Sequence, residues 1–229
     1  NMIIHDDGHT NVVAADGLQP IQEIVAKTGN RGFKPESFDC IITNPPFGST
    51  IKQVEHAYLG LYNLAERGVD WLNPKSKAAQ RPGVSSEILF IERCWEFLTE
   101  GGYLAIVIPD GILTNAPLQY VRDWIMDKFC VLAVVSLPQT TFMSTGAGVK
   151  SSVLFLRKRS WSLSKKLREA KEALQREIAE KWSLADELAK IDKRRKTALE
   201  KLDKRPEFAA LEKKSRKENA EYKTAADEI

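Results

Sequence analysis

The feature that most constrains the fold is an alternation of short apolar runs with amphipathic stretches along residues 1–159. Such alternation is typical of a mostly parallel sheet with helices on both faces. The apolar runs predict five strands, over Asn11 to Ala15, Phe38 to Thr43, Tyr103 to Ile108, Val131 to Leu137 and Ser151 to Arg157. The amphipathic stretches predict helices over Pro20 to Lys27, Ser86 to Leu98 and Leu118 to Lys128. The prediction is therefore an α/β layered fold.

The connection between the last two predicted strands gives a clue to topology. Residues Pro138 to Lys150 contain Gly146 and Gly148 and show no helical periodicity. A parallel crossover usually contains a helix, whereas an antiparallel pair can be joined by a loop. We therefore expect these two strands to run antiparallel at one end of the sheet.

Glycine and proline divide the chain into two parts. Residues 1–159 contain all 13 glycines and nine of the 10 prolines. Residues 160–229 contain no glycine and a single proline, Pro206. The second part has 19 Lys and Arg against 15 Asp and Glu, a balance of 19 − 15 = +4, which leaves −1 of the total of +3 for the first part. We predict one globular domain over residues 1–159, the body, and a charged helical tail over residues 160–229. The modest basic excess is compatible with nucleic acid but does not establish it.

The tail has apolar residues at spacings of three and four from Ser162 to Lys204. This pattern predicts a long amphipathic helix of coiled-coil type, interrupted at Ser183, where Ser183 and Asp186 suit a capping box. Pro206 should end it. A weaker helix from Glu207 onward, with apolar points at Phe208, Leu211 and Tyr222, is expected to fold back as a hairpin. A solvated helix pair and a partner-binding one fit the pattern equally.

The remaining composition excludes several classes of protein. Cys40, Cys94 and Cys130 lie far apart in apolar stretches, so we interpret them as reduced core residues. His5, His9 and His56 lack metal-ligand spacing, and no metal site is expected. No apolar run reaches the length of a membrane span, and no signal segment opens the chain. We expect a soluble, cytoplasmic protein.

The strongest local signal is Asn44-Pro45-Pro46-Phe47-Gly48, which directly follows a predicted strand. Loops at the carboxyl ends of parallel strands are where open α/β sheets place their active sites. Two successive prolines restrict the backbone of the loop, so Asn44 and the Pro45 carbonyl are held as acceptors. The alternative interpretation is a proline-stiffened turn with no chemistry.

An amino group conjugated to an aromatic ring is a poor nucleophile, because its lone pair is delocalised. Two acceptors on its two N–H groups favour a pyramidal nitrogen whose lone pair can point at a methyl sulfonium. Asn44 and the Pro45 carbonyl can supply these acceptors, Phe47 offers a stacking face, and Gly48 allows close approach. Phe142 is a candidate second stacking face, with core packing as the alternative. The pattern indicates methyl transfer to an amino nitrogen.

Several segments carry a resemblance to a known family: Asn1 to His5, Asn11 to Leu18, Asn44 to Gly48, Ser85 to Phe90, Gly101 to Gly111 and Gly148 to Phe155. With them, nearly all of residues 1–157 resembles the gamma-arranged amino-methyltransferases, most closely the modification subunits of type I restriction-modification systems. The resemblance implies a partial Rossmann-like methyltransferase sheet, parallel with one antiparallel strand, followed by a coiled-coil-like helical tail. It also implies methylation of the exocyclic N6 amine of adenine in DNA.

The resemblance further implies roles for individual residues. Asn44, Pro45, Pro46 and Phe47 match the family's catalytic loop, and Asp16, Leu18 and Asn44 would contact S-adenosylmethionine. Phe47 and Phe142 would hold a flipped adenine from double-stranded DNA. A specificity subunit and a restriction subunit are the implied protein partners, with no membrane involved. The Pro109-Asp110-Gly111 segment is interpreted as a turn on physical grounds alone.

One departure from the family pattern matters. No glycine-rich cofactor loop and no acidic residue of the family's second strand precede Asn11. We therefore expect a fragment of a longer protein that lacks half of its cofactor site. Two alternatives remain open: an amino-methyltransferase that uses the same loop on RNA or on a protein glutamine, and an inactive interaction module that carries the tail.

Overall fold

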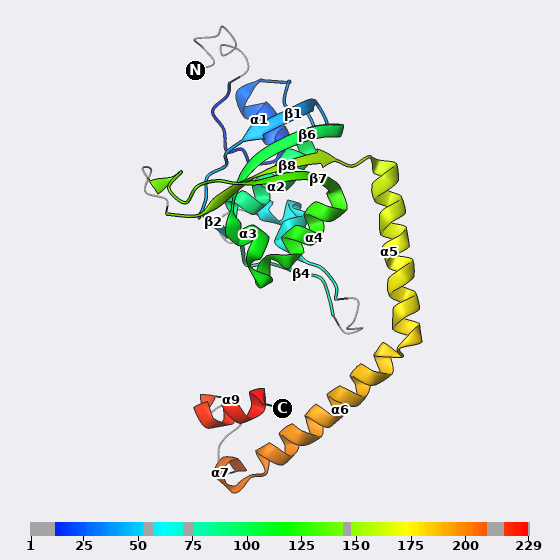
Figure 1. The fold of residues 1–229 in the computed structure, drawn as a ribbon. Helices are drawn as coiled ribbons and strands as arrows, with labels where there is room; N and C mark the ends of the chain where they lie inside the picture. The colour runs from blue at the N-terminus through cyan, green and yellow to red at the C-terminus, as the bar shows by residue number, and fades with distance from the viewer. Residues whose placement is uncertain (1–11, 53–56, 71–75, 144–147, 210–217, 229) are drawn as a thin grey trace. The chain divides into compact units, whose positions relative to one another are not determined.

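The computed structural model describes residues 12–52, 57–70, 76–143, 148–209 and 218–228 (Figure 1). Its internal contacts divide the chain into two compact units, one made of residues 1–68 and 78–171 and the other of residues 69–77 and 172–229. The first unit contains the main sheet and the second contains most of the tail. Among the described helices, none is long and apolar enough to cross a membrane.

The first unit is built on a four-stranded sheet in the order β1-β6-β8-β7. Its strands are β1 (Phe38–Thr43), β6 (Leu98–Pro109), β7 (Phe129–Ser136) and β8 (Ser151–Lys158). β1 pairs with β6 in parallel, and β8 lies antiparallel to both β6 and β7. The predicted antiparallel arrangement of the last two strands is confirmed, as is the α/β fold class.

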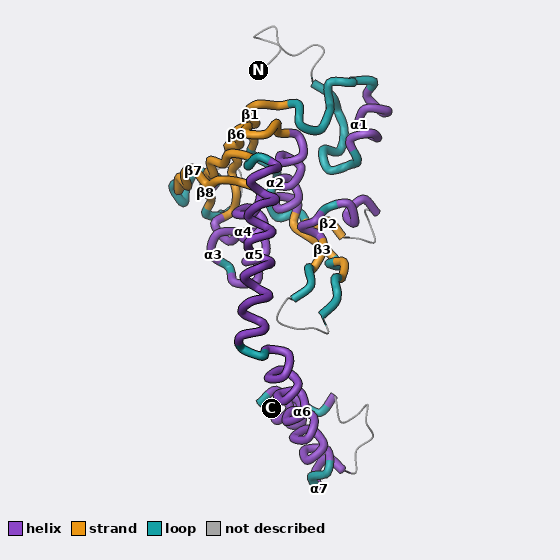
Figure 2. The backbone as a smooth tube through the Cα atoms, turned by 90° about the vertical axis from the view of Figure 1, so that its right-hand side faces the viewer, coloured by secondary structure: helices purple, strands orange, loops and turns teal. Residues whose placement is uncertain are grey.

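Helices cover one face of this sheet, as Figure 2 shows. The helices of the body are α1 (Ile21–Thr28), α2 (Ser86–Phe97), α3 (Asp110–Thr114) and α4 (Gln119–Lys128). Alternate side chains of β6 and β8, including Ile106 and Leu156, are fully buried with α2 and α4 in one apolar core. Short 3-10 helices η2 (Ala57–Leu61), η3 (Asn63–Ala65) and η4 (Ala116–Leu118) complete the covered side. The predicted helices are confirmed to within one residue at each end.

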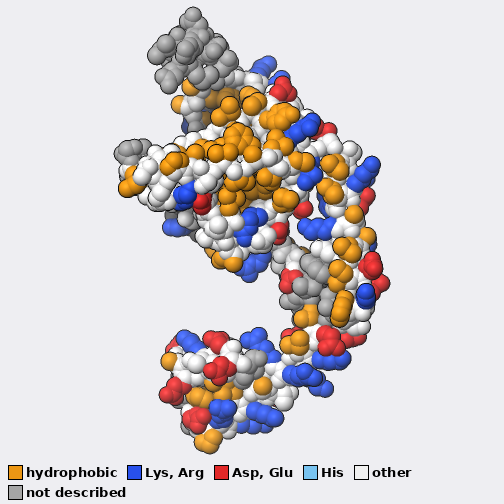
Figure 3. Space-filling view, viewed as in Figure 1, with side chains coloured by type: hydrophobic (Ala, Val, Ile, Leu, Met, Phe, Trp, Pro, Cys, Tyr) orange, Lys and Arg blue, Asp and Glu red, His pale blue; other side chains and the backbone are white. Residues whose placement is uncertain are grey.

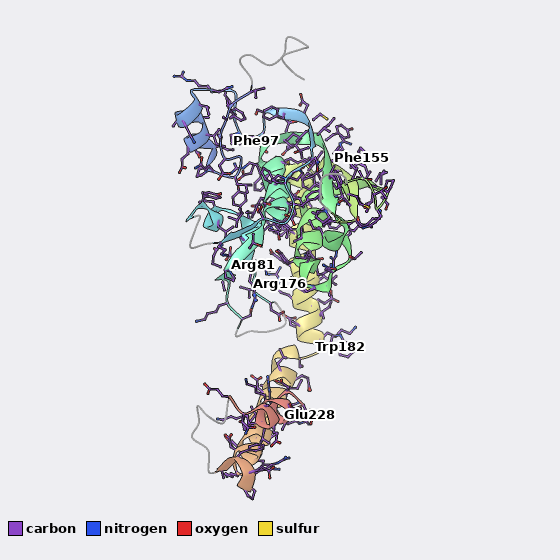
Figure 4. The ribbon with its side chains drawn as sticks, turned by 90° about the vertical axis from the view of Figure 1, so that its left-hand side faces the viewer. Arg81, Phe97, Phe155, Arg176, Trp182 and Glu228 are labelled. Atoms are coloured by element: carbon purple, nitrogen blue, oxygen red, sulfur yellow. The ribbon has the colours of Figure 1, made fainter. Side chains whose placement is uncertain are left out.

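The other face of the sheet differs from the expectation of helices on both sides. Within the described residues this face is open, and Figure 3 shows hydrophobic side chains gathered over it. Ile42 is 82% exposed, and the side chains registered across the sheet from it include Ala105, Phe155 and Ala133. An apolar sheet face is stabilised only when another layer covers it. The sequence pattern predicted helices on both faces of the sheet, but none of the described helices covers this face.

Two short antiparallel strand pairs, too short to predict from alternation, complete the strands of the described residues. β2 (Thr50–Lys52) pairs antiparallel with β5 (Gly83–Ser85), and β3 (Glu66–Arg67) pairs antiparallel with β4 (Ala79–Gln80). Because β5 runs directly into α2, the β2–β5 pair ties the segment after β1 to the start of that helix.

Three local predictions are wrong. Residues 12–15 form no strand, because none of the described strands lies beside them to bond to, and Asn11 lies outside the described residues. Pro109-Asp110-Gly111 is the junction of β6 and α3 and not a turn, since Asp110 begins the helix. Cys40 is exposed, because its strand is an edge strand with an uncovered face, whereas Cys94 is buried. His5, His9 and His56 lie outside the described residues.

The tail contains α5 (Trp161–Lys181), α6 (Leu184–Asp203), α7 (Pro206–Ala209) and α9 (Ala220–Asp227). The predicted interruption at Ser183 is confirmed, but its side chain makes no capping bond, because Ser183 adopts left-handed backbone angles (φ 45°, ψ 44°). Pro206 begins a short helix after α6 has ended. The Phe208 and Tyr222 rings meet edge to face at 5.4 Å, and the Tyr222 hydroxyl donates to Asp203, so α9 folds back on α6 as predicted.

Candidate active site

The Asn44–Gly48 loop lies at the carboxyl end of β1, next to the parallel strand β6. Thr43 is registered with Ile106, so the loop begins where the buried centre of the sheet ends. Pro45 is buried, Phe47 is partly buried, and Asn44 and Pro46 are exposed. The apolar side of the loop is therefore anchored while its amide side chain faces solvent.

The amino end of α2 holds this loop in place. The Ser86 hydroxyl donates to the Pro46 carbonyl at 3.1 Å, and the Gly48 N–H donates to the Glu87 carboxylate at 3.3 Å. The Ser86 N–H also donates to the Ser49 carbonyl at 2.8 Å. Ser86 and Glu87 are both buried, so these bonds are shielded from competing water.

Gly48 is required by the backbone. Its φ is +80°, in the left-handed region that side chains other than glycine rarely adopt. The chain can therefore turn sharply out of the Pro45-Pro46 segment and enter β2. A Cβ added at Gly48 would meet no atom within 4 Å, so the constraint is conformational and not one of space.

The Asn44 side chain is available for a ligand. Among the described residues it makes no hydrogen bond, and it is exposed. An amide left free beside a clamped backbone can accept from an incoming N–H without first breaking an internal bond. The Pro45 carbonyl and this amide are the two acceptors that the sequence predicted.

Phe47 and Phe142 come together from segments far apart in the chain. Their ring centroids are 6.0 Å apart and their planes are inclined at 86°, an edge-to-face contact. Both rings are only partly buried, so neither is committed to the core. The contact joins the loop after β1 to the loop before β8, as a paired aromatic site would require.

Hydrogen bonds within the chain fix the predicted cofactor-binding segment around Asp16. The Leu18 N–H donates to one Asp16 carboxylate oxygen at 3.0 Å, and the Tyr58 hydroxyl donates to the other at 2.8 Å. Burial and the bond to Asp16 raise the pKa of Tyr58 above its ordinary value, so that its hydroxyl keeps its proton. Asp16 is exposed, whereas Leu18 is 3% exposed and belongs to the core. The Leu18 side chain therefore packs inward.

Helix α2 contacts both predicted site elements. Glu87 holds the loop at Gly48, and Phe90 lies against Gly17, where an added Cβ would approach its ring to 3.3 Å. Arg93 donates to the carbonyls of Leu18 and Gln19 at 3.0 and 2.7 Å. Because a helix rises 1.5 Å per residue, the six steps from residue 87 to residue 93 span about 9 Å. One rigid element therefore spaces the two segments.

Sequence reasoning missed the residues that position the site. It recognised the Ser85-Ser86-Glu87 stretch as part of the resemblance, with Ser85 or Ser86 as a helix cap, but it connected neither Ser86 nor Glu87 with the Asn44–Gly48 loop. The structure explains the role of Glu87, because a buried carboxylate needs donors to satisfy it. Which donors it would find could not be read from the sequence, since Gly48 is 39 residues away.

An Asn-Pro-Pro-Phe loop follows a parallel strand, in a sheet whose one antiparallel strand, β8, lies between β6 and β7. This combination defines the class of the chain as an amino-methyltransferase fold. Comparison with known families makes this specific. The model of the N-6 DNA methylase family matches residues 1–226, and the chain belongs to that family.

Individual relatives agree with this assignment. The chain is 29% identical over 124 residues to the methylase subunit of the type I restriction enzyme EcoEI of Escherichia coli, covering 54% of this chain and 21% of that protein. It is 26% identical over 163 residues to the MpnII methylase subunit of Mycoplasma pneumoniae, covering 69% and 27%. A putative type II restriction enzyme and methyltransferase of Methanocaldococcus jannaschii is 26% identical over 126 residues, covering 55% and 9%. The chain thus spans about a quarter or less of these curated relatives.

Two solved structures show a weak likeness to the chain. A modification subunit of a putative type I restriction enzyme from Vibrio vulnificus is 19% identical with a TM-score of 0.48, covering 69% of this chain and 29% of that one. The EcoKI M protein is 22% identical with a TM-score of 0.44, covering 70% and 28%.

Proposed function

We propose that the chain carries the target-base half of a DNA methyltransferase that modifies the N6 amine of adenine in a type I restriction-modification system. The observation that carries the proposal is the clamped loop, in which Asn44 is free and exposed while Pro46 and Gly48 are fixed to α2. Membership of the N-6 DNA methylase family supports the choice of adenine in DNA over an RNA base or a protein glutamine.

In this proposal Asn44 and the Pro45 carbonyl accept the two hydrogens of the adenine amine. The amine is neutral and needs no strong base to bind there, since both acceptors are uncharged. Positive charge develops on the nitrogen as the methyl group arrives, and the two oxygens stabilise that charge. The nitrogen can then lose a proton to solvent, and Asn44 keeps its own protonation state throughout.

The target base must leave the DNA helix before it can reach the loop. Phe47 provides one face for the flipped ring, and Phe142, in contact with it at 6.0 Å, provides a second aromatic surface at the same place. Aromatic stacking on a base is worth roughly 1–3 kcal/mol and does not depend on base identity. The paired acceptors then fit a base that carries an amine and repel a carbonyl oxygen. The choice of adenine among the bases with an amine rests on membership of the N-6 DNA methylase family.

S-adenosylmethionine is the methyl donor that the family implies, and it supplies an electrophilic methyl group on a sulfonium. Asp16 fits a role in holding its adenine, because the carboxylate is exposed and two bonds leave part of its acceptor capacity unused. Tyr58 and the Leu18 N–H fix its orientation. Asn44, the second proposed contact, is exposed and unbonded among the described residues.

We further propose that the tail from residue 160 onward docks a specificity subunit, or a restriction subunit, of such a system. Exposed apolar side chains recur along its helices, among them Leu167, Leu174 and Ile191. Removing residues 160–229 from the complete protein should abolish co-purification with the specificity subunit and leave the body, residues 1–159, folded. Assembly that survives the deletion would show that the tail is a solvated appendage.

The function is tested by incubating the complete protein and its partner subunits with S-adenosylmethionine and unmethylated bacterial DNA. Mass spectrometry of the digested DNA should then detect N6-methyladenine. Methyl label recovered on cytosine, on RNA or on a protein glutamine would contradict the proposal, and an absence of label from every acceptor would favour the inactive interaction module.

A further inference from the structure

A cavity lies beside the Asn44–Gly48 loop and has no role in the proposed chemistry. Its volume is about 430 Å³, and it lies between the β4–β5 segment and the start of α4. The residues that line it are Arg67, Ala79, Gln80, Arg81, Pro82, Gly83, Val84, Ser85, Ile88, Pro117, Leu118 and Tyr120. This lining holds two arginines and no carboxylate, so the cavity is basic.

Arg81 is held in a fixed plane with its hydrogen-bonding capacity unused. Its guanidinium carbon lies 3.7 Å from the centre of the Tyr120 ring. Its Nε atom is buried without an acceptor, and among the described residues the guanidinium forms no ion pair. Stacking fixes the plane of the group and leaves its N–H edge free, the arrangement that binds an oxyanion through two parallel bonds.

Arg67 adds a second positive charge to the same cavity. It is registered with Ala79 across the β3–β4 pair, and Arg81 follows Ala79 by two residues. Side chains alternate along a strand, so Arg67 and Arg81 emerge on the same side as diagonal neighbours. Arg67 is exposed and forms no ion pair within the described residues.

Another cavity of the first unit contains a basic cluster whose charges are paired. That cavity, of about 320 Å³, contains Arg93 and Lys158, but Glu96 pairs with Arg93 at 2.8 Å and Glu36 pairs with Lys158 at 3.0 Å. Its charges are used to hold the fold together. Within the described part of the chain the Arg67 and Arg81 charges have no such partner, so they remain available to a ligand.

The basic cavity is one strand away from the loop that would receive the base. Ser85 lines the cavity and is registered with Thr50, and the next residue, Ser86, donates to the Pro46 carbonyl at 3.1 Å. Adjacent strands lie about 4.8 Å apart. A nucleic acid whose base occupied the loop would therefore carry its own backbone past this cavity.

We propose that Arg81 and Arg67 bind a backbone phosphate of the DNA strand, close to the flipped base. The inference rests on the proposed function for its choice of DNA. A phosphate diester fits the planar, bidentate donor set of Arg81, and a phosphate contact of this kind positions the strand without reading its sequence.

The test uses the complete protein and a fluorescently labelled duplex of mixed sequence, because phosphate contacts do not depend on sequence. Arg81→Gln should weaken binding roughly tenfold at low salt, as expected for one charged hydrogen-bonding group. It should also reduce the slope of log K against log salt by about 0.9, the value for one phosphate contact. Arg67→Gln should act in the same direction, and Arg81→Lys should restore the slope but only part of the affinity.

Arg31→Gln is the matched control, because Arg31 is exposed in the turn after α1 and lies outside the cavity. It removes the same charge and should leave the slope unchanged, and melting temperatures confirm that each variant is folded. An Arg81→Gln slope equal to that of the control would overturn the inference. The inference would also be overturned if Arg81→Gln bound DNA as the wild type does but lost a partner subunit, because the cavity would then be a protein-binding site. Methylation of bacterial DNA by the wild type, measured in parallel, tests the proposed function separately.

Discussion

The two ends of β1 use polar side chains in opposite ways. At the amino end, the buried Lys158 amine donates to Glu36 and to the carbonyls of Trp95 and Leu98, at 2.6 to 3.0 Å. At the carboxyl end, Asn44 is exposed and makes no hydrogen bond within the described part of the chain. A satisfied buried charge fixes the fold, whereas an unsatisfied amide on a fixed backbone is available for chemistry. The predictions below separate these two roles.

The largest effect should come from the structural end. Lys158→Met leaves the carbonyls of Trp95 and Leu98 without their donor, and each acceptor left unsatisfied in the interior costs about 1–3 kcal/mol. Urea unfolding of the complete protein should show this loss in the free energy of unfolding. Methyl transfer per folded molecule should stay unchanged. Lys165→Met, which removes one member of an exposed i,i+4 pair, is the control and should change stability by less than about 1 kcal/mol.

Asn44→Ala should show the reverse pattern at the other end. Loss of one preorganised polar group should reduce methyl transfer at least ~10²-fold, with cofactor binding and melting temperature little changed. Tritiated methyl incorporation into unmodified DNA gives the rate. Near wild-type turnover in this variant would remove the loop from the chemistry.

How far the sequence predicts this contrast depends on the range of the interactions. The bounds of β1 were predicted from the six residues that form it, because an apolar run ending in Asn-Pro-Pro is a local signal. The roles of Lys158 and Arg81 were not predicted, since their surroundings come from distant segments. Lys158 and Glu36 are 122 residues apart, and Arg81 stacks on Tyr120.

The strand predicted over residues 12–15, which the structure does not contain, also shows that a local pattern does not determine long-range pairing. The apolar pattern of Val12 to Ala15 is local, but a strand exists only when a neighbour completes its hydrogen bonds. Within the site, the residues of the Asn44–Gly48 loop were identified from type and order alone. The meeting of Phe47 with Phe142 at 6.0 Å could only be suggested, because nothing in the sequence places the two loops together.

Phe47→Ala should have an intermediate effect. Stacking contributes on the order of 1–3 kcal/mol per base, so the variant should retain the flipped base less well and lose methyl transfer by a corresponding factor. Phe47→Tyr and Phe47→Trp should recover much of the activity, because each keeps an aromatic face. Fluorescence of a 2-aminopurine at the target position reports base flipping directly. If Phe47→Ala instead lowered only the melting temperature, the ring would be a packing residue.

The smallest effect should come from Ser86→Ala, which sharpens the comparison because Ser86 acts on the loop and touches no substrate. Its hydroxyl donates to the Pro46 carbonyl and lies 3.4 Å from the Glu87 carboxylate. One intramolecular hydrogen bond is worth about 0.5–1.5 kcal/mol, so methyl transfer should fall roughly two- to tenfold if the loop loosens.

The expected signature of a positioning residue is a lower kcat with an unchanged KM for S-adenosylmethionine, recovered in Ser86→Thr, which keeps the hydroxyl. A purely structural role would lower the melting temperature and leave kcat per folded molecule intact. Combining Ser86→Ala with Asn44→Ala decides between them. If Ser86 acts by holding Asn44 and Pro45 in place, the double variant should be little slower than Asn44→Ala alone, since the group being positioned is already gone. Full additivity of the two losses would show that the clamp and the amide act independently.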